Sequence, residues 1–136
     1  MNAVRSLAIV AITFAAATPA LAGQYGVFRN PSGSVDVKVA DCGAGLCGTI
    51  VKASAKARAD AAEAGQRNII GMQLFRDLKP VRQPAGQPKR WEGSVYIPDR
   101  DKTVSGRAEL SGKTLLVEGC LIGDKLCKAQ NWVRVR

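Results

Sequence analysis

Hydrophobic and polar residues alternate along the last third of the chain, residues 89–136. Alternation with a period of two is typical of a β-strand that has one buried and one solvent-facing side. Turn-forming residues interrupt the pattern at 98–101, 111–112 and 123–124, where proline, aspartate, serine and glycine gather. The pattern therefore predicts four antiparallel strands joined by three tight turns.

The predicted register separates the two faces of this sheet. With those turns, we expect pairs at 97/102, 110/113 and 122/125. Tyr96 and Glu92 then belong to the outer face, where Glu92 lies opposite Arg107 as a cross-strand ion pair. The inner, buried face is expected to carry Trp91, Val95, Ile97, Val104, Ala108, Leu115, Val117, Leu121, Gln130, Trp132 and Arg134.

The first half of the chain is also predicted to form mainly β-strands, with one helix as the exception. Strands are expected around residues 25–28, 35–39 and 46–51, and an apolar run at 69–75 could form another. Residues 55–64 are rich in alanine, follow Ser54 as a candidate N-cap and stop before a glycine, which predicts the one helix. Residues 80–88 contain three prolines and are expected to form an exposed loop.

Four cysteines fall into two local pairs, Cys42 with Cys47 and Cys120 with Cys127, each around a glycine-containing turn. A two-residue turn at 123–124 brings the second pair directly opposite each other, within disulfide reach. Neither pair has the two-residue spacing of zinc or thioredoxin-like motifs. We expect two structural disulfides and no metal.

These elements amount to about eight strands and one short helix, an all-β fold. An antiparallel meander of this size avoids exposed edges best by closing into a small barrel, calycin- or lipocalin-like in style. Such a barrel is either filled with side chains or holds one small ligand.

Residues 1–22 have the pattern of a cleavable secretory signal: Arg5, an uncharged apolar run, and small residues at Ala20 and Ala22. The run is too short for a transmembrane span. We therefore expect a single exported domain over residues 23–136, periplasmic or secreted, where disulfides persist. The chain carries a formal net charge of +9, which in that compartment favours anionic lipids and acidic polymers over nucleic acid.

No histidine is present. Its absence removes the commonest general base and the usual Ser-His and Cys-His arrangements, so we expect a protein that is not an enzyme and uses no cofactor. Asp99 and Asp101 flank a turn, which explains Asp99 without an acid/base pair or a calcium site.

Five segments resemble the exported bacterial family catalogued as domain of unknown function 2147 (DUF2147): residues 41–43, 46–51, 91–99, 118–123 and 130–135. The likeness covers nearly all of the chain after residue 22. It implies a small periplasmic or secreted β-rich domain and brings no catalytic residues.

The candidate site consists of Trp91, Gln130, Trp132 and Arg134. A guanidinium and an amide on a buried face must find partners or line a cavity. Arg134 could receive the anionic head of a small amphiphile from the cell envelope while the tryptophans form apolar walls, or it could lie at the barrel mouth with its head in water. The alternative function is a protein-interaction or envelope-stress accessory module. That module would use the basic surface. Separately, residues 76–82 with 89–90 form a basic loop that could engage acidic envelope polymers or simply be a flexible, solvated loop.

Overall fold

The computed structural model describes residue 11 and residues 23–136. The predicted signal sequence, residues 1–22, lies outside the described residues apart from Ala11. The described chain forms eight strands, one α-helix and one short 3₁₀ helix. Their bounds are β1 Gln24–Arg29, β2 Val35–Cys42, β3 Gly45–Ala53, α1 Ala55–Glu63, β4 Phe75–Val81, β5 Lys89–Ile97, η1 Pro98–Arg100, β6 Lys102–Ser111, β7 Thr114–Ile122 and β8 Lys125–Arg134.

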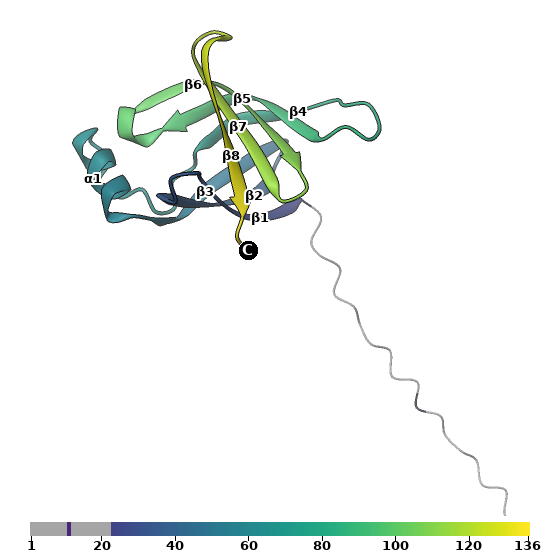
Figure 1. The fold of residues 1–136 in the computed structure, drawn as a ribbon, viewed down its shortest axis with the longest axis horizontal. Helices are drawn as coiled ribbons and strands as arrows, with labels where there is room; N and C mark the ends of the chain where they lie inside the picture. The colour runs from purple at the N-terminus through teal and green to yellow at the C-terminus, as the bar shows by residue number, and fades with distance from the viewer. Residues whose placement is uncertain (1–10, 12–22) are drawn as a thin grey trace, which may run out of the picture.

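The strands form a closed antiparallel barrel in chain order, with β8 returning to β1 (Figure 1). Phe28 pairs with Arg134 at this closure, and the backbone N–H of Val27 donates to the carbonyl oxygen of Arg136 at 2.8 Å. Gly26 has a positive φ of 112°, and a Cβ there would lie 2.5 Å from the same Arg136 oxygen. Glycine at this position therefore allows the C-terminal segment to seal the barrel.

The core fills the barrel interior with apolar side chains. The largest of them that are almost fully buried are Phe28, Phe75, Leu46, Ile50, Leu78, Leu115, Val37 and Val39. Trp91, Val104, Ala108, Val117 and Trp132 are also buried, so the predicted facing of the C-terminal sheet is confirmed for these residues.

The meander from β5 to β8 follows the predicted turns with one shift. Ile97 pairs with Lys102, and Ile122 pairs with Lys125. Ser111 pairs with Thr114, so the middle turn is at 112–113 rather than 111–112. A shift of two residues in the pairing keeps every side chain on its predicted face.

Three predictions about this sheet are wrong. Leu121, expected inside, is 50% exposed because it lies beyond the barrel wall near the hairpin tip. Tyr96, expected on an open outer face, is buried, since Arg76 stacks 4.0 Å above its ring centre. Arg107 lies opposite Glu92 as predicted, but the two form no ion pair with each other.

Each of these charges instead has another partner. Arg107 Nε lies 3.1 Å from Glu118 Oε1 on β7, and Arg90 Nη2 lies 2.6 Å from Glu92 Oε1. Both charges of the expected pair are therefore neutralised by residues on the same strand or on a neighbouring one.

The helix is confirmed, with the Ser54 hydroxyl accepting from the Ala57 N–H at 3.1 Å. It lies beside η1 at one end of the barrel (Figure 1). No helix among the described residues has the length and apolar composition needed to cross a membrane.

The segment after the helix departs from the sequence prediction. Residues 69–74 form no strand beyond one isolated bridge between Thr49 and Gln73. The strand is β4, which covers most of the predicted basic loop at 76–82 and the first residues of the loop expected at 80–88. A bulge between Arg76 and Lys79 lets β4 pair with β5, and Gly93 provides the room, because a Cβ there would lie 1.9 Å from the Asp77 carbonyl oxygen.

Candidate functional site

A cleft of about 550 Å³ lies where the β4–β5 loop meets the turn between β2 and β3. Figure 1 shows this loop projecting from the side of the barrel. Four stretches of chain line the cleft: Tyr25 of β1, Asp41 with residues 43–45, residues 80–81, and residues 83–91. The cleft is therefore built between a disulfide-closed turn and a proline-containing loop.

Two aromatic rings form the inner wall of the cleft. Trp91 is 4% exposed, and its ring meets that of Tyr25 edge to face, with centroids 5.5 Å apart and planes at 67°. Aromatic pairs of this geometry hold each other's orientation. The wall is thus apolar and sterically defined.

The hydroxyl of Tyr25 is bound to an acidic residue. It donates to Asp41 Oδ2 at 3.0 Å. Burial, with this hydrogen bond and the negative charge of Asp41, raises the pKa of Tyr25 to about 12. The phenol consequently stays protonated at physiological pH and holds Asp41 against the cleft wall.

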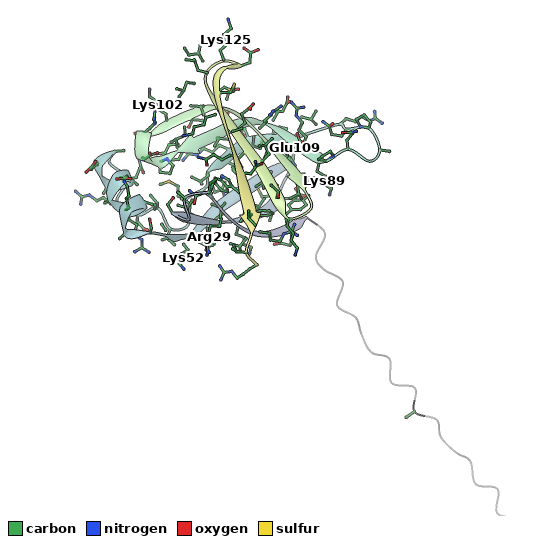
Figure 2. All side chains as sticks on the ribbon, in the orientation of Figure 1. Arg29, Lys52, Lys89, Lys102, Glu109 and Lys125 are labelled. Carbon is green, nitrogen blue, oxygen red and sulfur yellow. A yellow bond between two sulfur atoms is a disulfide. The ribbon has the colours of Figure 1, made fainter. Side chains whose placement is uncertain are left out.

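Two cations flank the aromatic pair. The ammonium nitrogen of Lys89 lies 5.3 Å from the centre of the Tyr25 ring, and Figure 2 shows Lys89 beside the β4–β5 loop. Arg90 Nη2 is paired with Glu92, whereas its Nε is buried without a hydrogen-bond partner among the described residues. A buried donor left unpaired is unfavourable, so a ligand anion or a water that reached Arg90 would be favoured there.

A second cleft, of about 280 Å³, lies on the other side of the same disulfide-closed turn. Ala44 and Gly45 line both clefts. Gly45 abuts β4, since a Cβ there would lie 2.7 Å from the carbonyl oxygen of Leu78. The β2–β3 turn therefore separates the two clefts.

Residues 26–134 match the family described as "Uncharacterized protein conserved in bacteria (DUF2147)". The chain belongs to the DUF2147 family. The resemblance stated from the cysteine segments and the C-terminal strand is thereby confirmed. No curated protein and no solved structure matches the chain significantly. The family description assigns no activity to its members.

Among the sequence-predicted site residues of this DUF2147 chain, two lie together. Trp132 Nε1 donates to Gln130 Oε1 at 3.1 Å, and the Trp132 ring lies 6.2 Å from that of Phe75 at 37°. The indole N–H of Trp132 therefore has its hydrogen-bond partner within the same strand of the barrel. Trp91 is held separately, against Tyr25.

Arg134 occupies a third position. Its guanidinium carbon lies 5.2 Å from the centre of the Phe28 ring, at the seam where β8 meets β1. Its Nε is buried and has no hydrogen-bond partner within residues 23–136. Of the four predicted residues, Trp91 lines the larger cleft, and Gln130, Trp132 and Arg134 line neither of these two clefts.

Sequence reasoning missed Tyr25 and the loop at 83–88 as parts of a site. The available signal was the adjacency of Lys89 and Arg90 to Trp91 after a proline-rich stretch. That signal indicates a strand that begins with basic and aromatic residues. It does not predict that the β2–β3 turn lies opposite these residues.

The structure confirms both disulfides, Cys42–Cys47 and Cys120–Cys127. Glu118, Cys120 and Cys127 have ligand atoms within 4.8 Å of one another. Because both sulfurs are used in the disulfide, this cluster offers a single carboxylate and does not make a metal site in this state.

Proposed function

We propose that this DUF2147 chain is a non-enzymatic binding domain that takes a small amphiphile with an anionic head in the cleft beside Trp91. The observation that carries the proposal is the meeting, in one cleft, of the Tyr25–Trp91 wall with the cations of Lys89 and Arg90. Trp91 is retained from the sequence-predicted site, and Gln130, Trp132 and Arg134 are not part of the proposed contact surface.

The size and lining of the cleft support a small ligand. Ligand clefts usually enclose about 300–1,000 Å³ and combine apolar walls with a few polar groups, and 550 Å³ falls in this range. Pro80, Val81 and Pro84 extend the apolar lining. An apolar tail would lie along these residues while the head meets the cationic side chains of Lys89 and Arg90.

The non-enzymatic part of the proposal is supported by the acid/base groups in the cleft. Asp41 is the one carboxylate among its lining residues, and it already accepts the hydroxyl hydrogen of Tyr25. The sequence contains no histidine.

The place of action is proposed to be the periplasm or the extracellular space. The signal-like residues 1–22 motivate this, and two disulfides fit an oxidising compartment. Intact mass of the protein recovered from the periplasm should correspond to residues 23–136; material that retains Met1 would contradict export by cleavage.

The binding proposal is tested by tryptophan fluorescence. Trp132→Phe leaves Trp91 as the sole tryptophan, so its emission reports the cleft. We expect monomeric dodecyl phosphate to saturate the signal, and dodecyltrimethylammonium, with the same tail and the opposite charge, to bind at least tenfold more weakly. Inorganic phosphate tests the head alone and should bind weakly, because the apolar tail supplies most of the buried area.

A charge-removal variant with a matched control completes the test. Lys89→Gln with Arg90→Gln removes two cations and should weaken dodecyl phosphate by about tenfold to a hundredfold, the usual value of a charge-assisted hydrogen bond. Arg100→Gln with Lys102→Gln removes the same charge outside the cleft and should leave the affinity unchanged; Figure 2 shows Lys102 on the opposite side from Lys89. A flat titration of the folded parent would contradict the proposal.

A further inference from the structure

The hairpin between β7 and β8 extends past the wall of the barrel. Every residue from 121 to 129 is exposed, and Figure 1 shows this hairpin rising above the other strands. We call residues 121–129 the hairpin tip. None of them lines either of the two clefts, so the tip is a separate surface whose role is independent of the proposed function.

The tip presents large apolar side chains to solvent. Leu121 is 50%, Ile122 62% and Leu126 66% exposed. Single exposed apolar residues are ordinary, whereas several clustered on one projecting element mark a contact surface. Because these three side chains are exposed, they contribute little to the stability of the barrel. Stability therefore does not explain why apolar residues occur at these positions.

Leu126 adds a backbone feature. Its φ is 54°, in the left-handed region that side chains other than glycine rarely adopt. The β7–β8 register contains the pairs Cys120 with Cys127 and Ile122 with Lys125 and no pair between Leu121 and Leu126. Leu126 lies between the 123–124 turn and the Cys120–Cys127 disulfide, and its side chain is exposed to solvent.

Positive charge accompanies the apolar groups. Lys125 and Lys128 are exposed on the tip, against a single acidic residue, Asp124, and Figure 2 shows Lys125 at the end of the hairpin. Lysine side chains can bury their methylene stems beside apolar groups and extend their ammonium to a negatively charged surface. The tip is therefore apolar at its end and cationic at its flanks, within a chain of net charge +9.

We propose that the hairpin tip docks the protein on an anionic lipid surface. Leu121, Ile122 and Leu126 enter the boundary between head groups and acyl chains. Lys125 and Lys128 contact the lipid phosphates. Charge complementarity favours this occupant, and so does the reach of the tip: two strand residues beyond Cys120 span about 7 Å, comparable with the depth of about 5–10 Å at which interfacial elements lie in a bilayer.

The test is a vesicle flotation assay. It uses the protein in the form in which it is purified from the cells that express it, and the intact mass of that form is recorded. The vesicles contain phosphatidylcholine alone or phosphatidylcholine and phosphatidylglycerol in equal parts. We expect the parent to float with the anionic vesicles and to remain behind with the neutral ones. Leu121→Ser, Ile122→Ser and Leu126→Ser combined should lower the bound fraction by more than tenfold, without loss of cooperative melting because these side chains are exposed.

Charge variants and matched controls separate the tip from the rest of the basic surface. Lys125→Gln and Lys128→Gln should each weaken anionic-vesicle binding by about fivefold. Ile70→Ser removes an apolar side chain that is 40% exposed elsewhere, and Lys52→Gln removes an exposed cation far from the tip (Figure 2). Both controls should float like the parent.

Three results would overturn the proposal. The parent could fail to float with anionic vesicles. The triple serine variant could float as well as the parent, which would assign binding to another part of the basic surface. The parent could instead sediment as a dimer that the triple variant does not form, without floating, which would assign the tip to a second copy of the chain.

Discussion

The two disulfide-closed hairpins of the barrel have different surroundings. Cys42–Cys47 closes the β2–β3 turn, where Leu46 is 2% exposed and pairs with Leu78 of β4. Cys120–Cys127 closes the β7–β8 hairpin, whose tip has no buried residue. A disulfide thus closes a hairpin that is packed against the barrel in one case and a hairpin that projects into solvent in the other. The difference is that β4 pairs with the first hairpin, whereas the tip of the second is exposed.

The largest effect is expected at the base of the projecting hairpin, where it joins the core. Trp132→Ala should lower the free energy of unfolding by about 3–5 kcal/mol, the usual cost of truncating a buried tryptophan, since this side chain is 6% exposed and lies against Phe75. Ile122→Ala, at the tip of the same hairpin, should change it by less than about 0.5 kcal/mol. Denaturant midpoints of the two variants measure the contrast; similar midpoints would mean that base and tip are not distinct.

Removal of each disulfide is expected to have the next largest effect on stability. Each bond closes a short loop, so replacing both its cysteines by serine should cost at most about 2–3 kcal/mol, and both variants should still fold. The functional losses should differ: the Cys42→Ser, Cys47→Ser protein should lose affinity for dodecyl phosphate, and the Cys120→Ser, Cys127→Ser protein should lose vesicle binding. Loss of both activities in either variant would show that the two hairpins are coupled.

A smaller, pH-dependent effect belongs to the β1–β2 side of the barrel. Arg29 Nε and Nη2 donate to the buried carboxylate of Asp36 at 2.7 and 2.9 Å. These hydrogen bonds lower the pKa of Asp36 more than burial raises it. A lowered folded-state pKa stabilises the fold above the unfolded value, about 3.9, and this contribution is lost as pH falls through the folded value.

Asp36→Asn should therefore reduce stability at pH 7 and flatten the loss of stability below about pH 4. Melting temperatures over the acid range provide the measurement. Asp124→Asn, at the exposed hairpin tip, is the control and should keep the acid profile of the parent. An unchanged profile in the Asp36 variant would contradict the role given to the Arg29 pair.

The sequence predicted best the part of the fold whose pairing is local. From β5 to β8, turn residues and alternation determined the order, the facing of the strands and the 120–127 disulfide. The middle turn lies one residue further along the chain than predicted, because Ser111–Gly112 and Gly112–Lys113 are equally good two-residue turns by composition. Facing survived that error because the pairing shifted by two residues and strand periodicity is two.

The sequence predicted least where distant segments meet. β4 contains Pro80 and several charges, so it has the composition of a loop, and it becomes a strand because β5 pairs with it across Gly93. Tyr96 is buried by Arg76, and no local sequence pattern predicts this contact. For the same reason the cleft was not predicted: the β4–β5 loop and the β2–β3 turn come together only in the folded barrel.

The central claim, that the cleft beside Trp91 takes an anionic amphiphile, is tested most directly by amide chemical shifts. Monomeric dodecyl phosphate is added to the isotopically labelled protein in the absence of vesicles. We expect saturable shifts concentrated at Tyr25, residues 43–45 and the non-proline residues of 83–91, with the hairpin tip unchanged. Shifts centred on Gln130, Trp132 and Arg134 would contradict it and place the ligand inside the barrel, and an unchanged spectrum would contradict small-amphiphile binding altogether.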